Sequence, residues 1–205
     1  MLGVAIALAA AAPQFLPPVE RCGGDPAFSR VRSQLNRSVA QRDLDGLVAL
    51  MSNDVRISFG SGVGKEAFVR QWSSSPNDRA RLWLELDKVL RLGCAKAVDG
   101  SGREYRAMPA MFVTGDGLDG FSTWVALPSA VIRRRPKASA SVRTRLAAWS
   151  VLENVDHDGG DWIEVRSNGL PGYISTKQAR SLLDYRIVFG HREGQWRITA
   201  FVAGD

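Results

Sequence analysis

The sequence lacks the short motifs that mark the commonest nucleotide-dependent and metal-dependent enzymes. Its 205 residues contain no P-loop, no dinucleotide-binding glycine fingerprint, no Gly-x-Ser-x-Gly nucleophile motif and no zinc-ligand spacing. Histidine and cysteine are both scarce, with two of each in the chain. We therefore expect a protein that is not an enzyme, has no catalytic residues and binds no cofactor or metal.

Long apolar runs are also rare, and the longest lies at the beginning. Residues 2–12 are apolar or small, a run shorter than the ~20 residues of a membrane span but typical of the hydrophobic region of a signal peptide. Ala10 and Ala12 supply small residues for cleavage, and Pro13 ends the run. We predict a signal peptide over residues 1–18, a periplasmic or secreted bacterial protein, and no membrane span after processing. No Lys or Arg precedes the run, so a different start site stays open.

The two cysteines, Cys22 and Cys94, are predicted to form a disulfide. An even number of cysteines in an exported chain is more often paired than free. Neither has a nearby histidine in the sequence, which gives a nucleophilic or metal-binding role little support. Such a bridge would tie the N-terminal segment to the first domain, and its long loop makes it worth roughly 4 kcal/mol in the chain-entropy treatment.

Lysine is scarce too, so arginine carries most of the positive charge. The chain has 27 Lys and Arg residues against 21 Asp and Glu residues, a net charge of +6, and only five of the basic residues are lysine. Arginine binds carboxylates and phosphates in a bidentate way, so a basic surface favours anionic partners. Predicted export and the lack of a recognition helix argue against nucleic acid. A compositional arginine bias on a solvated surface stays open as the alternative.

The first half of the chain has a helical pattern. Asp25 is expected to cap a helix with Pro26 in its first turn, and apolar residues at three- or four-residue spacing form one face: Phe28, Val31, Leu35 and Val39. A short helix should follow Asp43, then a strand over 55–60, a helix over 65–72 and another over 79–92 that ends at Gly93.

The segments LVALMSNDV, RISFG and KEAFVRQW resemble the opening of nuclear-transport-factor-two-like domains, in which helices pack into a curved sheet to form a cone. The last segment, DYRIVFGHREGQWRITAFVAGD, has the alternation of a β-hairpin and is similar to the closing strands of such domains. The resemblance implies one α+β domain made of residues 22–124 and 184–205. Catalytic members place an Asp-His pair or several acids in the cone, whereas His157 and His191 lie outside the opening segments.

Residues 125–183 carry a second resemblance, to bacterial SH3 domains. VIRRRP at 131–136 resembles their N-V-R-x-G-P start, and DWIEVRS and GYIS resemble later strands. Val131 and Arg135 depart from the family's Asn and Gly. The two resemblances imply an α+β fold, a helix-plus-curved-sheet cone with an inserted small SH3-like β-barrel. Alternation predicts the inward residues of this barrel: Ile132, Val142, Leu146, Val151, Leu152, Ile163, Val165 and Ile174.

The SH3 resemblance implies a groove for cell-wall ligands, because similar domains recognise peptidoglycan stem peptides. The candidate ligand-binding residues are Arg133, Arg134, Trp149, Trp162 and Tyr173, with aromatic faces against a peptide or glycan and arginines on its carboxylates. Packing in the core or rim is the alternative role of these aromatic residues. We expect a non-catalytic exported protein that binds cell-envelope material, whether a cell-wall peptide, a glycan or an envelope protein.

A second function stays open. The cone itself is the alternative site, as a small-molecule-binding or enzymatic domain to which the SH3-like module is accessory. Its lining candidates are Asp54, Arg56, Trp72 and Trp83.

Overall fold

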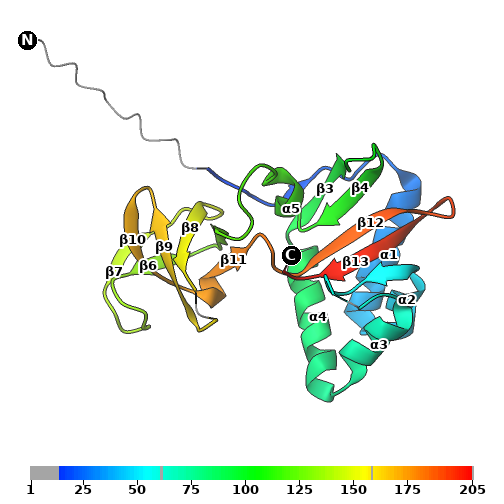
Figure 1. The fold of residues 1–205 in the computed structure, drawn as a ribbon, viewed down its shortest axis with the longest axis horizontal. Helices are drawn as coiled ribbons and strands as arrows, with labels where there is room; N and C mark the ends of the chain where they lie inside the picture. The colour runs from blue at the N-terminus through cyan, green and yellow to red at the C-terminus, as the bar shows by residue number, and fades with distance from the viewer. Residues whose placement is uncertain (1–13, 61, 158, 205) are drawn as a thin grey trace, which may run out of the picture. The chain divides into compact units, whose positions relative to one another are not determined.

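The computed structural model describes residues 14–60, 62–157 and 159–204, so most of the predicted signal peptide, residues 1–13, lies outside the described residues. The chain divides into two compact units (Figure 1). The helical unit consists of residues 17–118 and 182–204, and the strand unit contains residues 14–16 and 119–181. The strand unit therefore interrupts the helical unit in the sequence.

The helical unit combines helices with a mixed, unclosed sheet, so its class is α+β. Its elements are β1 (Val19–Glu20), α1 (Pro26–Gln41), α2 (Leu44–Ala49), β2 (Met51–Arg56), α3 (Lys65–Ser73), α4 (Pro76–Leu90), β3 (Gly93–Val98), β4 (Glu104–Met108), α5 (Met111–Thr114), β12 (Arg186–Arg192) and β13 (Gln195–Val202). The strand order is β1-β3-β4-β12-β13-β2. The two outer pairs, β1 with β3 and β2 with β13, are parallel, and the inner pairs are antiparallel.

The first helix begins at the residue that the sequence predicts. The Asp25 carboxylate accepts hydrogen bonds from the backbone N–H groups of Ala27 and Phe28 at 2.8 and 3.1 Å. Pro26 occupies the first turn, where the missing N–H costs no hydrogen bond. The predicted face is confirmed, since α1 buries Phe28, Leu35 and Val39, while Val31 packs partly buried against the same core.

The core lies between the helices and one face of the sheet, and Figure 1 shows α1 behind β12 and β13. Phe189 of β12 and Phe201 of β13 are buried in one cluster with Phe28, Phe68 and Trp72 of the helices. Phe28 and Phe189 meet edge to face with ring centroids 5.1 Å apart. The hydrophobic effect of these large rings fixes the helices on the sheet.

The predicted Cys22–Cys94 disulfide is confirmed. It joins the N-terminal segment to β3, where Val19 and Glu20 of β1 pair with Gly93 and Cys94. Gly93 has φ +73°, and a Cβ there would lie 2.2 Å from the Val19 carbonyl oxygen, so this close pairing requires glycine.

The last hairpin, β12 and β13, lies in the sheet of the helical unit. β12 pairs with β4, and β13 pairs with β2, all within the helical unit. The hairpin thus completes the sheet between strands that precede the strand unit in the sequence.

The strand unit is built from short antiparallel strands. Its elements are β5 (Thr123–Ala126), β6 (Val131–Arg133), β7 (Val142–Arg145), β8 (Val151–Asp156), β9 (Trp162–Ser167), β10 (Leu170–Ser175), the 3₁₀ turn η1 (Thr176–Gln178) and β11 (Ala179–Ser181). The strand order is β11-β5-β8-β9-β10-β6-β7. Its core contains five of the predicted inward residues, fully buried: Ile132, Leu152, Ile163, Val165 and Ile174.

Some predicted boundaries and one core residue are wrong. β2 begins at Met51, ahead of the predicted 55–60, because β13 pairs alongside this stretch. α4 begins at Pro76, ahead of residue 79, because the Ser75 side chain caps it by accepting from the Asp78 N–H. Val142 is 41% exposed, since β7 lies at the edge of its sheet.

Candidate functional site

A row of polar side chains crosses four adjacent strands of the strand unit. Asp156 of β8 pairs with Glu164 of β9, Glu164 with Tyr173 of β10, and Tyr173 with Arg133 of β6. Directly paired residues of antiparallel strands place their side chains on the same face. The residues next to Glu164, Tyr173 and Arg133 along their strands include the fully buried Ile163, Val165, Ile174 and Ile132, so the cross-strand row, Asp156, Glu164, Tyr173 and Arg133, lies on the outer face. It runs from two carboxylates through a phenol to a guanidinium.

A depression of about 330 Å³ lies over the acidic half of the row. Trp162 and Tyr173 line it together with carboxylates and small residues: Pro136, Asp156, Gly160, Asp161 and Glu164. Trp162 and Glu164 are two residues apart on β9, which puts both on the outer face. Aromatic faces beside carboxylates attract ammonium or guanidinium groups, because both the ring face and the carboxylate stabilise a cation.

Tyr173 is held in the row by a charged neighbour. Its hydroxyl donates a hydrogen bond to Glu164 Oε2 at 3.3 Å. The negative charge of Glu164 is the main reason that the pKa of Tyr173 lies above its usual value, with burial adding to the effect. The ring is therefore a neutral hydrogen-bond donor at neutral pH, with its face beside the depression.

The predicted ligand-binding residues divide into two groups. Trp162 and Tyr173 lie together at the depression, and Arg133 stands one strand further along the row, where its Nη1 donates to the Ala140 carbonyl at 2.6 Å. Arg134 is exposed beyond the end of β6 and does not line the depression. Trp149 precedes β8 with φ +69° and is half-buried away from it.

The carboxylates of the depression were not among the predicted site residues. Glu164 shares the alternation of Trp162, and this period of two is the sequence signal that places both on one face. Asp156 and Asp161 flank the turn between β8 and β9. Acidic residues at such positions usually indicate a turn, because their side chains hydrogen-bond to the local backbone. Their convergence depends on strand register, which the sequence does not specify by itself.

The four lining candidates of the alternative site in the helical unit lie in two different places. Trp72 and Trp83 are both buried in the main cluster of this unit. Asp54 and Arg56 are exposed on β2 and line cavities on the other side of the sheet from Phe189 and Phe201. The four residues therefore do not gather around one interior pocket.

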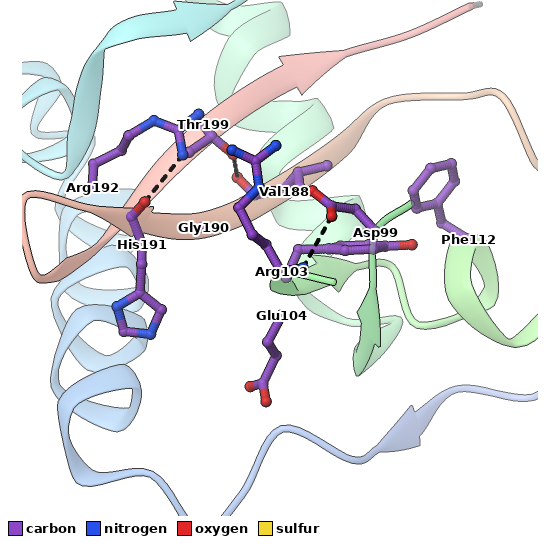
Figure 2. Close-up of a pocket in the computed structure, with 10 residues that line it drawn as sticks. Asp99, Arg103, Glu104, Phe112, Val188, Gly190, His191, Arg192 and Thr199 are labelled. Atoms are coloured by element: carbon purple, nitrogen blue, oxygen red, sulfur yellow. Dashed lines mark hydrogen bonds and ion pairs between the residues drawn. The ribbon is translucent and has the colours of Figure 1, made fainter. Parts of the chain in front are cut away.

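Two adjoining cavities lie on the open face of the helical unit's sheet, opposite α1, α3 and α4. Their volumes are about 490 and 500 Å³, and they share five lining residues: Arg103, Phe112, Val188, Arg192 and Thr199. Figure 2 shows these side chains around the first cavity, with Arg103 paired to Asp99. We call the surface formed by the residues that line these two cavities the open-face groove; none of the predicted ligand-binding residues lies in it.

Within the described parts of the chain, His, Cys, Asp and Glu side chains form no group of three or more that fits a metal ion. The helices that the structure describes include none long and apolar enough to cross a membrane.

Comparisons with known proteins give distant structural likenesses alone. No protein-family model and no curated protein matches the sequence. An NTF2-like protein with a cystatin-like fold from Novosphingobium aromaticivorans is 12% identical over 86% of this chain and 77% of that chain, with a TM-score of 0.31. A chain named as a variant of Rd1NTF2 is 11% identical over 86% of this chain and 96% of its own length, with a TM-score of 0.27. Structural similarities with TM-scores this low do not indicate what this chain binds.

Proposed function

We propose that the chain is a non-catalytic exported protein whose strand unit binds peptides of the bacterial cell envelope, foremost peptidoglycan stem peptides. The observation that carries this proposal is the cross-strand row, which orders carboxylates, an aromatic ring and an arginine on one outer face. A short peptide with free amino and carboxylate groups has the complementary charges, its amino group toward the carboxylates of the row and its carboxylate toward Arg133.

The strand unit is proposed to be a bacterial SH3-like barrel. β5 and β6, joined by four residues, pair with the two ends of the β8-β9-β10 meander: β5 with β8 and β6 with β10. One continuous segment thus borders both sides of the meander, an arrangement that supports a small barrel around the Ile132, Ile163 and Ile174 core.

The helical unit is proposed to be a nuclear-transport-factor-two-like domain that serves as a scaffold. Its aromatic cluster fills the space between helices and sheet, which supports a structural role for that face. The Cys22–Cys94 disulfide is compatible with export, since disulfides persist in oxidising compartments.

A peptidoglycan cosedimentation assay tests the proposed function. At low salt we expect the native chain to be retained with insoluble peptidoglycan, and we expect Trp162→Ala and Arg133→Ala each to lower the retained fraction severalfold. Matched controls are Phe121→Ala, an aromatic residue that is 68% exposed in the same unit, and Arg145→Ala, an exposed arginine of β7 outside the row. Failure of the native chain to sediment, or equal retention of all four variants, contradicts the proposal.

A further inference from the structure

The hairpin formed by β6, β7 and the loop between them, residues 131–145, is rich in positive charge. It holds six of the chain's 27 basic residues, and no Asp or Glu occurs over residues 120–152. The charge of this stretch therefore equals the net charge of the whole chain, +6. We call residues 131–145 the basic hairpin, and its cations are Arg133, Arg134, Arg135, Lys137, Arg143 and Arg145.

Acids do not neutralise the cations of the basic hairpin. Among the residues that the structure describes, no carboxylate forms an ion pair with any of the six. Arg133 and Arg143 each donate from Nη1 to a backbone carbonyl oxygen, at 2.6 and 2.8 Å. Arg134, Arg135 and Lys137 are exposed in the loop. The hairpin thus presents a group of uncompensated positive charges.

Backbone hydrogen bonds hold the loop of the basic hairpin in one conformation. The Arg134 N–H donates to the Ser141 carbonyl at 3.1 Å and closes the base of the loop. Nearer the tip, the Lys137 N–H donates to the Arg135 carbonyl at 2.8 Å, and the Ala140 N–H donates to the Lys137 carbonyl at 3.0 Å. A loop whose backbone is already ordered loses less conformational entropy when a partner binds. Its three cations therefore form a preorganised group.

Protection of a sheet edge explains only part of this charge. β7 lies at the edge of its sheet, and cations on an edge strand hinder pairing with another chain. This role accounts for Arg143 and Arg145, which lie on β7. It does not account for Arg134, Arg135 and Lys137, which lie between β6 and β7 and outside either strand. The loop cations therefore indicate a partner of opposite charge.

The position of the loop cations favours an extended partner over a small anion. None of the cavities described above is lined by these three residues, and the loop borders the strand-unit depression through Pro136. A small anion is usually held in a concave site that surrounds it. Exposed cations on a loop instead suit a broad anionic surface, which many basic side chains contact together.

Exposed apolar side chains lie among the cations. Pro136 is exposed within the loop, and Val142, which pairs with Arg133 across the hairpin, is 41% exposed. Basic residues interspersed with exposed apolar ones suit the boundary between lipid headgroups and acyl chains. We propose that the basic hairpin binds the surface of an anionic phospholipid membrane, with the loop cations on lipid phosphates. This membrane contact goes beyond the proposed peptide binding and does not depend on it.

Cosedimentation of the intact chain with sucrose-loaded vesicles tests this proposal. One set of vesicles contains phosphatidylglycerol mixed into phosphatidylcholine, and the other contains phosphatidylcholine alone, so the two sets differ in surface charge. We expect binding to the anionic vesicles that falls as salt is added, because salt screens exposed charges. Binding to phosphatidylcholine alone should be at least about tenfold weaker. Equal binding to the two sets overturns the proposal.

A charge-matched pair of variants separates the basic hairpin from net charge. The hairpin variant combines Arg134→Gln, Arg135→Gln and Lys137→Gln, all exposed and therefore of little risk to folding. The control variant removes the same charge from exposed residues of the helical unit, by combining Arg30→Gln, Arg37→Gln and Lys96→Gln.

The two variants should differ strongly in their binding to anionic vesicles. A basic side chain near an anionic surface is worth about a factor of five in affinity, so the hairpin variant should bind about a hundredfold more weakly than the native chain. The control variant should bind less than about threefold more weakly, because its lost charges lie off the contact surface. Equal losses in the two variants, or native-like binding of the hairpin variant, overturn the proposal.

Two other partners of the basic hairpin have distinct outcomes. Duplex DNA that binds the native chain more tightly than anionic vesicles do, at equal phosphate concentration, overturns the proposal. Self-association of the native chain that the hairpin variant abolishes also overturns it, because the acidic depression of a second copy then covers the hairpin. Trp162→Ala, at the depression, should bind vesicles as the native chain does, so failure of the peptide proposal and failure of this one are distinguishable.

Discussion

Asp25 uses its two carboxylate oxygens for two purposes. Oδ1 caps α1, and Oδ2 accepts from Trp196 Nε1 at 2.7 Å and from Arg106 Nη2 at 3.1 Å. Arg106 is 4% exposed and lies 4.3 Å from the Phe28 ring centroid and 4.5 Å from that of Trp196. One acidic residue thus links the start of a helix, a buried cation and the last strand of the sheet.

Substitutions of Asp25 should lower stability in a graded, pH-dependent way. Asp25→Ala loses the cap and the charge partner of Arg106, for a loss of about 2 kcal/mol, whereas Asp25→Asn keeps the cap and should lose less. Hydrogen bonds from the Phe28 N–H and from Trp196 hold the pKa of Asp25 below its usual value. This contribution is complete above the unfolded pKa of about 4 and is lost as pH falls through the folded pKa. Urea unfolding of native chain and Asp25→Asn should therefore converge at low pH; a gap that widens on acidification contradicts the assignment.

Tyr173 offers a residue-scale test of the cross-strand row. Glu164→Gln removes the negative charge that chiefly raises the pKa of this tyrosine, so that pKa should fall toward about 10. Tyr105 and Tyr185 also have raised pKa values, but burial is the main cause there. Ultraviolet absorbance titration should show one of the chain's three tyrosines shifting and two unchanged. An unchanged curve means that Glu164 and Tyr173 are not neighbours in solution.

At the scale of elements, β12 separates the structural face of the sheet from the open face. Phe189→Ala should cost about 3–5 kcal/mol because it empties a fully buried ring site between helices and sheet. Val188→Ala, on the half-buried open face, should cost about 1 kcal/mol or less. Chemical denaturation of both variants measures the difference, and equal losses would mean that the two faces are wrongly assigned.

The elements themselves were largely predictable, and the sites were less so. Asp25 with Pro26, and Asp43, marked helix starts because capping is local chemistry. In the strand unit, the register of β8, β9 and β10 brings the acids close to Trp162. In the helical unit, Arg56, Arg103 and Arg186 come from distant parts of the chain and line one cavity. Alternation along β9 places Glu164 on the face of Trp162, but no local pattern brings acids of β8 or arginines of distant segments to the same place, so the sequence predicted the aromatic residues of the strand-unit depression and not its charges.

At the scale of the molecule, the chain consists of two units with separate cores. Scanning calorimetry should therefore show two unfolding transitions. The Cys22–Cys94 bridge lies in the helical unit, and its loss should lower the stability of that unit by about 2–5 kcal/mol. Reducing agent should shift one transition and leave the other in place. A single transition that moves as a whole would show that the units unfold together.

The cross-strand row as a peptide site is tested most directly by titrating the intact chain with a soluble stem peptide that has free amino and carboxylate groups. We expect saturable binding to the native chain, at least about tenfold weaker binding to Trp162→Ala, and a similar loss when the peptide's amino group is acetylated. Undiminished binding of the peptide to Trp162→Ala, or no heat of binding to the native chain, would contradict the peptide site.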